Sequence, residues 1–323
     1  MLFISVIIPT LNRCETLKNA IASAQGQTWP ADQYEIIVVD NGSTDGTSHS
    51  VERLEKESKT LIRVIHEPLL GLHNARHAGA RAAKGEVLMF TDDDATFEPD
   101  WVRAYAEAFA KYPEMMAAGG PVRPFWETQP PQWLLSYMGN EKTFGILSLM
   151  EPYSEFRLDQ KGFFFGVNMA VRRQVLFKVG GFNPDSFGDI WLGDGETGLN
   201  RKLWERQMLI GYVPGAVVFH HIPPQRMTAR YFCRRMANEG ACEMYALFHQ
   251  GVPHWLRLLK QVAGITVRNG KYWLAALLFR GRTDTRSIRI QIRAAKTFSN
   301  LKYVIRLTYD KDFRKLVLEQ NWL

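Results

Sequence analysis

EVLMFTDDD, residues 86–94, joins four apolar residues at consecutive positions to three adjacent aspartates. Because the run is apolar at consecutive and not at alternate positions, it predicts a strand that is covered on both faces. Apolar runs of this kind alternate with stretches of helical period, so strands are expected at residues 4–9, 34–40, 61–66 and 86–91, and helices at residues 15–24, 47–59, 75–84 and 101–112. This alternation predicts an α/β fold with a mostly parallel sheet flanked by helices.

Polar side chains follow three of these runs at the point where each run ends. Thr10, Asn12 and Arg13 follow the first run, residues 41–46 follow the second, and residues 92–94 follow the fourth. Ligands of parallel α/β sheets bind at the carboxyl ends of the strands. We therefore expect the three clusters to face one crevice.

The aspartate cluster predicts a cation site. Three adjacent carboxylates repel one another, and Mg²⁺ or Mn²⁺ would offset their charge, with one or two of them as ligands and the rest supplied by water and a diphosphate. Because side chains alternate in direction at a strand end, Asp92 and Asp94 can point the same way. The alternative is a turn or N-cap cluster ahead of a helix that begins near Asp100.

The motif VVDNGSTDGT, residues 38–47, couples a buried strand to a polar turn and a helix. Asp40 or Asn41 could recognise the edge of a nucleotide base, and backbone N–H groups near a helix start can receive anionic oxygens. The alternative is a well-formed turn with Asp45 near the helix start.

The motif GLHNARHAGARAAKGE, residues 71–86, places two arginines near the opening of a helix. An arginine near a helix N-terminus opposes the helix dipole, which favours an anionic ligand there. We expect Arg76 to contact the donor nucleotide and Arg81 to belong to a solvated basic face.

The motif WLGDGETGLNRKL, residues 191–203, places Asp194 and Glu196 just before a helical stretch. Partial burial would raise the pKa of a carboxyl group towards the range of a useful base. The alternative is that both acids only cap the helix.

Two adjacent histidines, His220 and His221, end the apolar run AVVF. Neighbouring side chains of a strand point to opposite sides, so at most one of the two should face the crevice. That histidine could be a metal ligand, and the alternative is a satisfied surface histidine.

The net charge of +7 is concentrated at the end of the chain, because residues 251–323 contain 15 Lys and Arg against 4 Asp and Glu. Cations interleaved with Trp255, Trp273 and Trp322 favour contact with an anionic membrane face. Two alternatives are a helical cap whose cations are solvated and a nucleic-acid-binding surface on which bases stack.

Other features predict a cytoplasmic location. The three cysteines have unrelated spacings, which argues against a disulfide framework, and residues 1–30 show no secretion signal. The longest apolar run, residues 272–279, is far shorter than the roughly 20 residues that cross a bilayer.

Six motifs in order resemble family 2 glycosyltransferases with the GT-A fold: SVIIPTLNR, VVDNGSTDGT, GLHNARHAGARAAKGE, FTDDDATFEPDW, GVNMAVRRQVLFKVGGF and GDGETGLNRKL. The resemblance covers roughly residues 3–250. It implies a Rossmann-like sheet with a catalytic domain at residues 1–250, divided into a nucleotide-sugar and metal half (1–118) and an acceptor half (119–250). Residues 251–323 then form a basic helical extension.

The resemblance also implies roles for individual residues. The expected nucleotide-binding residues are Pro9, Thr10, Asn12, Arg13, Asp40, Asn41, Arg76, Asp92 and Asp93. The expected metal ligands are Asp94 and Asp92, with His220 and His221 as further candidates. Counting back three residues from Leu199 makes Glu196 the catalytic base, with Asp194 in reserve, and the expected acceptor-side residues are Gly120, Asn168 and Trp191.

The implied activity is inverting transfer of a sugar from a nucleotide diphosphate donor, with UDP expected, to an acceptor hydroxyl. Mg²⁺ or Mn²⁺ is the expected cofactor, and a glycan or a lipid-linked molecule is the expected acceptor. Such a reaction fits surface polysaccharide or glycolipid synthesis at the inner face of the plasma membrane. The alternative enzyme is a sugar-phosphate nucleotidyltransferase, but residues 8–13 lack the glycine-rich phosphate loop with which such enzymes usually open.

Overall fold

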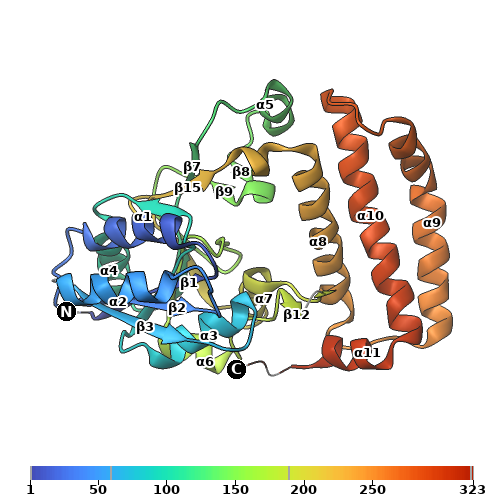
Figure 1. The fold of residues 1–323 in the computed structure, drawn as a ribbon. Coiled ribbons are helices and arrows are strands. Elements are labelled where there is room, and N and C mark those ends of the chain that lie inside the picture. The colour runs from blue at the N-terminus through green and yellow to red at the C-terminus, as the bar shows by residue number, and fades with distance from the viewer. Residues whose placement is uncertain (1, 59, 188–189, 321, 323) are drawn as a thin grey trace.

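The computed structural model describes residues 2–58, 60–187, 190–320 and 322 (Figure 1). Its main sheet has eight strands in the order β10-β14-β6-β11-β4-β1-β2-β3. Their bounds are β1 Ile4–Thr10, β2 Tyr34–Asp40, β3 Leu61–His66, β4 Val87–Phe90, β6 Met115–Gly119, β10 Arg157–Asp159, β11 Met169–Arg172 and β14 Leu209–Tyr212. β1 to β4 are parallel, and β11 is antiparallel to both of its neighbours. The predicted mostly parallel sheet is thus confirmed.

The sheet is covered on both faces, as the consecutive apolar residues predict. Along β1, Ile4, Val6 and Ile8 join one hydrophobic core, whereas Ile7 joins another on the opposite face. The first core receives α1 (Cys14–Gln25) and α4 (Trp101–Lys111), and the second receives α3 (Leu72–Ala82), while α2 (Thr47–Glu57) packs beside β3. Helices packed on both faces of the sheet therefore fix the position of the strands, whose carboxyl ends lie at one edge.

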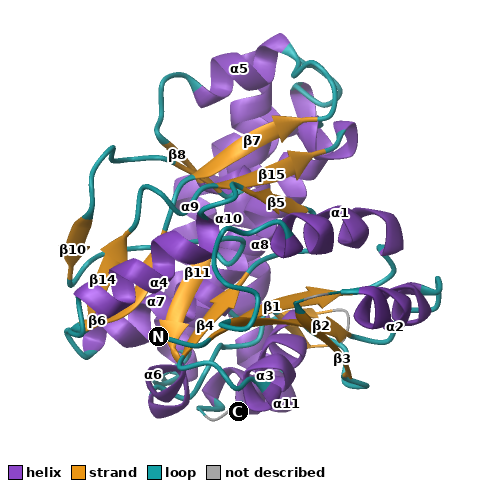
Figure 2. Cartoon of the chain, turned by 90° about the vertical axis from the view of Figure 1, so that its left-hand side faces the viewer, coloured by secondary structure: helices purple, strands orange, loops and turns teal. Residues whose placement is uncertain are grey.

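A second sheet, in the order β5-β15-β7-β9-β8, lies beside the first and is seen above it in Figure 2. Its strands are β5 Ala95–Phe97, β7 Val122–Trp126, β8 Thr143–Phe144, β9 Leu149–Met150 and β15 Val218–Ile222. β15 pairs with β5, directly after the aspartates, and the backbone N–H of His221 donates to Asp94 O at 2.9 Å. This pairing brings residues 218–222 to the aspartate cluster.

The remaining elements before the C-terminal helices lie between strands of the same sheet or, for η2, between β15 and the helices. They are α5 Gln132–Met138, η1 Gly145–Leu147, α6 Arg173–Lys178, β12 Ser186–Phe187, β13 Ile190–Trp191, α7 Gly195–Glu205 and η2 Pro224–Met227. Between residues 119 and 166 the strands have only two to five residues, which is too short to show a periodicity in the sequence.

The C-terminal part is helical, as predicted. It contains α8 Ala229–Phe248, α9 Trp255–Leu278, α10 Thr285–Tyr309 and α11 Lys311–Leu318. Figure 1 shows α10 between α8 and α9, with α11 across their lower ends. A third core joins all four helices to Leu192, whose carbonyl accepts a hydrogen bond from Tyr303 at 2.9 Å. Within the described part of the chain, no helix is long and apolar enough to cross a bilayer.

Candidate active site

The polar clusters after the strands meet in one cleft, as the sequence predicts. We call it the donor cleft, after the nucleotide donor that the sequence resemblance implies, and its volume is about 550 Å³. Seven of the expected nucleotide and metal residues line it, namely Pro9, Thr10, Arg13, Asn41, Asp92, Asp93 and Asp94. The carboxyl ends of β1, β2 and β4 therefore build the site together.

Asn12 and Asp40 do not line the donor cleft. Their side chains instead accept hydrogen bonds from the segment that follows β2. Asn12 has a positive φ of 54°, and its Oδ1 accepts a hydrogen bond from Thr44 N at 2.7 Å. Asp40 is buried and accepts hydrogen bonds from Ser43 N and from Ser48. Burial alone would raise the pKa of Asp40, but these hydrogen bonds lower it below its usual value.

Asn41 lines the cleft with its side chain engaged by the backbone. Its Nδ2 donates to Glu67 O at 2.8 Å and to Leu69 O at 2.7 Å, and its Oδ1 accepts from Gly71 N at 2.8 Å. These bonds tie the end of β2 to the start of α3. Asn41 thus shapes the wall of the cleft where α3 begins.

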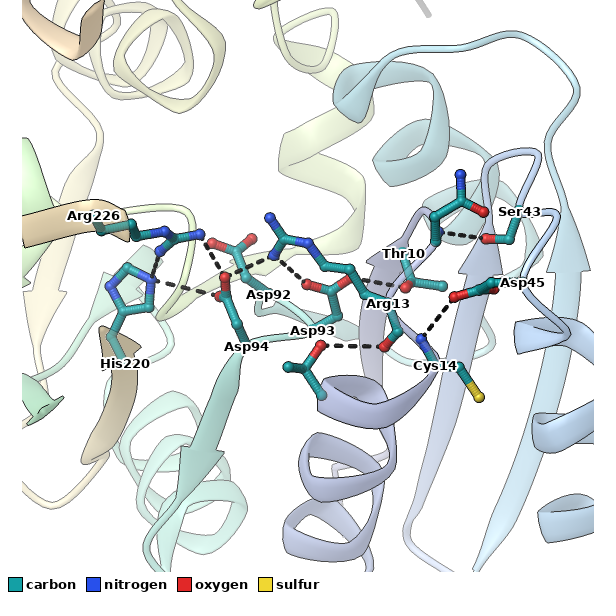
Figure 3. A network of polar contacts seen from close by, with 12 residues as sticks. Thr10, Arg13, Cys14, Ser43, Asp45, Asp92, Asp93, Asp94, His220 and Arg226 are labelled. Atoms are coloured by element: carbon teal, nitrogen blue, oxygen red, sulfur yellow. Dashed lines mark hydrogen bonds and ion pairs between the residues drawn. The ribbon is translucent and has the colours of Figure 1, made fainter. Parts of the chain in front are cut away.

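The three aspartates have different partners (Figure 3). Asp93 accepts from Thr10 Oγ1 at 2.7 Å and from Arg13 Nη1 at 2.9 Å, and burial raises its pKa to about 6 although Arg13 opposes this shift. Asp94 lies 2.7 Å from Arg13 Nη1 and 2.6 Å from Arg226 Nη2. Burial acts to raise the pKa of Asp94, but His220 and the two arginines hold it well below its usual value.

Arg226 was not identified from the sequence. It lies in η2, after β15, and its Nη1 is 2.6 Å from His220 Nε2. Together with Arg13 it places two cations at the aspartate cluster, where a diphosphate would need them.

The two histidines point in opposite directions, as expected for neighbours on a strand. His220 is buried, donates from Nδ1 to Leu147 O at 2.9 Å, and places Nε2 3.5 Å from Asp94 Oδ1. His221 stacks on Phe125 with ring centroids 4.4 Å apart, and its Nε2 is 3.2 Å from Thr96 Oγ1. His221 is therefore wrong as a metal ligand, because strand alternation turns its side chain away from the aspartates.

The surroundings of Asp94 fit a divalent cation. Its Oδ1 is buried and, among the described residues, has no hydrogen-bond partner. That oxygen faces His220 Nε2, and a carboxylate with an imidazole is a ligand pair that a divalent transition ion such as Mn²⁺ accepts. No group of three His, Cys, Asp or Glu side chains with metal-binding geometry occurs in the described ranges. Such a cation usually takes its remaining ligands from water and phosphate.

Arg76 lies between the aspartate cluster and Glu196, the expected base. It is 2% exposed, with Nη2 3.4 Å from Asp92 Oδ1 and Nη1 3.4 Å from Glu196 Oε2. Its guanidinium carbon lies 5.3 Å from the ring centroid of Phe182. A Cβ at Gly166 would collide with this guanidinium, so a larger residue there would force Arg76 to shift.

Glu196 lies in the first turn of α7 and lines a second cavity beside the donor cleft, the central crevice. Burial acts to raise its pKa, but the cations of Arg76 and Arg235 lower it below its usual value. The expected upward shift is therefore wrong, since the attraction of buried cations outweighs desolvation. Asp185, which the sequence analysis did not identify, shares the crevice with Glu196, and its pKa rises to about 7 through burial and repulsion by Glu196.

Asp194 is not placed to act as a base. It is buried, with Oδ2 2.9 Å from Arg201 Nη2 and Oδ1 2.8 Å from Asn183 Nδ2. The backbone turn at Gly195 directs it into the protein while Glu196 points to the crevice. The assignment of Asp194 as the reserve base is therefore wrong, because its carboxylate points into the protein and is paired there.

Of the three expected acceptor-side residues, only Trp191 lines the crevice. Asn168 is fully buried, where its Oδ1 accepts from Trp101 Nε1 at 2.9 Å and Tyr105 Oη at 2.8 Å. A Cβ at Gly120 would collide with Ala216 O. Asn168 and Gly120 are thus corrected to packing positions beneath the site.

Three cavities adjoin one another, because each shares lining residues with the next. The donor cleft adjoins the central crevice, of about 450 Å³, and both are lined by Asp92 and Arg226. The crevice adjoins an outer pocket of about 770 Å³, and both of these are lined by Glu196 and Arg235. Glu196 therefore lies across the crevice from the aspartate cluster.

Comparison with known proteins gives the family. Residues 5–180 match the family described as "Glycosyl transferase family 2". Among curated relatives, the glucosyl-dolichyl phosphate glucuronosyltransferase of Haloferax volcanii is 27% identical over 57% of this chain and 56% of its own length. The validoxylamine A glucosyltransferase of Streptomyces hygroscopicus subsp. jinggangensis is 28% identical over 59% of this chain and 49% of its own. The chain thus spans about half the length of these relatives.

Solved structures agree on the fold. The mannosyltransferase PcManGT from Pyrobaculum calidifontis, solved with GDP-Man and Mn²⁺, has a TM-score of 0.58 and 19% identity, covering 95% of this chain and 87% of its own. GalNAc-T7, solved with UDP, GalNAc and Mn²⁺, has a TM-score of 0.54 and 20% identity over 73% of this chain and 48% of its own. The predicted GT-A fold is confirmed, and the family match over more than half of the sequence shows that this chain belongs to glycosyl transferase family 2.

Proposed function

We propose that the protein is an inverting glycosyltransferase that moves a sugar from a nucleotide diphosphate donor to an acceptor hydroxyl. The observation that carries this proposal is the row of adjoining cavities from the donor cleft to the outer pocket, in which Asp92 lines the first two and Glu196 lines the last two. Family membership favours this function over a nucleotidyltransferase or a nucleic-acid-binding protein.

The donor would lie in the cleft at the strand ends. Pro9, Thr10 and Asn41 would line the nucleoside, and the diphosphate would lie near Arg13 and Arg226. Asp94, with His220 and Asp92, would hold Mg²⁺ or Mn²⁺. When bound, the cation would offset the charge that grows on the leaving diphosphate.

Glu196 would act as the general base. Its lowered pKa keeps the carboxylate ionised at neutral pH, so it can accept a proton. The acceptor oxygen forms a bond to the anomeric carbon, the bond from that carbon to the diphosphate oxygen breaks, and the hydroxyl proton passes to Glu196. Because attack and departure occur on opposite faces of the sugar, the anomeric configuration inverts.

For the acceptor and the cellular location, we infer only a class of molecule and a membrane face. The name of the Haloferax relative includes a dolichyl phosphate, which supports a lipid-linked acceptor for this chain as well. A lipid-linked acceptor fits surface polysaccharide or glycolipid synthesis at the cytoplasmic face of the membrane. We expect UDP as the nucleotide.

Peripheral membrane contact would involve α9. This helix exposes apolar side chains, including Leu256, Val267, Leu274 and Leu278, next to cations such as Lys271. Each cation near an anionic lipid surface contributes about 1 kcal/mol. Vesicles that contain anionic lipid should therefore bind the chain. Replacing Lys260 and Lys271 by Glu should weaken this binding, and unchanged binding would contradict the proposed membrane contact.

A thermal-shift panel of nucleotide sugars, with and without Mn²⁺, tests the donor assignment. A ligand that binds only the folded protein raises its melting temperature. We expect one nucleotide sugar to stabilise the chain more strongly when Mn²⁺ is present. If no nucleotide sugar stabilises it under either condition, the proposed donor cleft is wrong.

A further inference from the structure

The outer pocket is built from parts of the chain that are far apart in sequence. Aromatic residues line one side, namely Tyr137, Phe144, Phe163 and Phe165. α7 supplies Glu196, α8 supplies Arg235, and α10 supplies Arg289 and Lys296. The C-terminal helices thus form part of the wall next to the proposed base.

Most charges of the pocket are already engaged or lie at its exposed rim. Lys296 Nζ is 2.6 Å from Glu243 Oε1, and Glu196 is paired with Arg76. Arg289 lies 5.5 Å from the ring centroid of Tyr137 and is exposed. The acids Glu141 and Glu239 are also exposed.

Arg235 differs from these residues. It is partly buried, lines both the crevice and the outer pocket, and makes no hydrogen bond or ion pair with any described residue. Burial alone would lower its pKa, whereas the carboxylates of Glu196 and Asp185 raise it, so the guanidinium stays charged. Because no carboxylate or carbonyl among the described residues accepts from this guanidinium, its N–H donors are free to bind an anionic ligand in the outer pocket.

We propose that Arg235 binds an anionic group of the acceptor, and that the acceptor is an anionic saccharide whose ring packs on the aromatic side of the outer pocket. This inference rests on the proposed function. Arg235 is assigned to the acceptor because it lines the outer pocket, whereas it does not line the donor cleft. Its planar fork matches either a uronic-acid carboxylate or a glycosyl phosphate, and both offer paired oxygens.

Binding measurements on the full chain test this proposal with three probes: methyl β-D-glucuronide, glucose 1-phosphate and the neutral methyl β-D-glucoside. Wild type should bind one anionic probe at least about tenfold more tightly than the neutral one, since a charge-assisted bond adds this much affinity. Preference for the glucuronide would identify a carboxylate, and preference for glucose 1-phosphate would identify a phosphate.

The matched variants are Arg235→Gln and Arg230→Gln. Arg230 is an exposed arginine of the same helix and lines neither the crevice nor the outer pocket. Arg235→Gln should abolish the preference for the anion while its melting temperature and its nucleotide-sugar binding stay close to wild type, and Arg230→Gln should keep the preference.

Equal binding of charged and neutral probes by wild type, no binding of either anionic probe at millimolar concentration, or a preference that survives Arg235→Gln would overturn the inference. A guanidinium that only balances Glu196 and Asp185 would give such a result. Nucleotide-sugar binding is measured separately, so failure of the proposed donor site would be recognised independently.

Discussion

Arg76 Nη1 lies 3.4 Å from Glu196 Oε2, and this contact joins the donor side of the site to the acceptor side. The same guanidinium lies 3.4 Å from Asp92 through its other nitrogen. Because Arg76 is buried, both attractions act in a medium of low polarity and are stronger than on the surface. The ionisation of Glu196 therefore depends on a residue that also touches the aspartate cluster.

Replacing the proposed base should affect turnover much more than donor binding. Glu196→Gln keeps the size of the side chain but cannot take a proton, so turnover should fall by about 10² to 10⁴. Glu205→Gln, which changes an exposed acid at the other end of the same helix and lines none of the three cavities, is the matched control and should retain turnover. Near-normal turnover by Glu196→Gln would remove it from the role of base.

The two histidines provide a direct comparison for the metal. His220→Ala removes the imidazole that faces Asp94, whereas His221→Ala removes one that stacks on Phe125. We expect the first change to raise the Mn²⁺ concentration for half-maximal activity by about 10- to 100-fold. His221→Ala should leave it unchanged, and equal effects of the two variants would contradict the assignment.

The raised pKa of Asp185 predicts a specific pH dependence of stability. Between its usual value and about 7, the folded carboxyl holds a proton that the unfolded chain has released. The free energy of unfolding should therefore fall with rising pH across this window, by at most about 1.4 kcal/mol per unit from this group, and level off above it. Asp185→Asn should flatten this fall in urea denaturation at several pH values, and an unchanged slope would show that Asp185 ionises normally.

Asn168 should matter for stability and not for acceptor affinity. Asn168→Ala leaves the buried donors of Trp101 and Tyr105 without an acceptor, and each such group costs about 1 to 3 kcal/mol. We therefore expect a loss of at least about 2 kcal/mol in denaturant unfolding, whereas Asn140→Ala, at an exposed position, should be neutral. A stable Asn168→Ala variant with a raised acceptor KM would restore the acceptor role.

The sequence predicts which residues gather at the donor cleft because the motifs that carry them are local. Thr10 ends β1 and Asp93 comes shortly after β4, and parallel strands bring their carboxyl ends to one edge whatever the details of packing. The contact of Arg226 with Asp94 joins residues separated by 132 positions, and nothing near Arg226 marks it as a partner. Contacts of this kind depend on how the second sheet docks, which periodicity does not encode.

The acceptor side was predicted less well for a related reason. A glycine or asparagine in a loop motif can face a ligand or fill a packed interior, and only the surrounding chain decides between the two. Asn168 bonds to Trp101 and Tyr105 of α4, to Pro121 and to Ala216, which come from three separate segments. The contribution of α10 to the outer pocket could not be predicted for the same reason. Its basic composition fits a membrane-facing surface, a solvated surface and a nucleic-acid-binding surface equally.

The most direct test is a crystal structure of the chain with Mn²⁺ and the nucleotide sugar that stabilises it best. We predict that the ion contacts Asp94, that the two phosphates lie beside Arg13 and Arg226, and that the anomeric carbon faces Glu196 across the crevice. A donor bound outside this cleft, or one whose sugar points away from Glu196, would contradict the account.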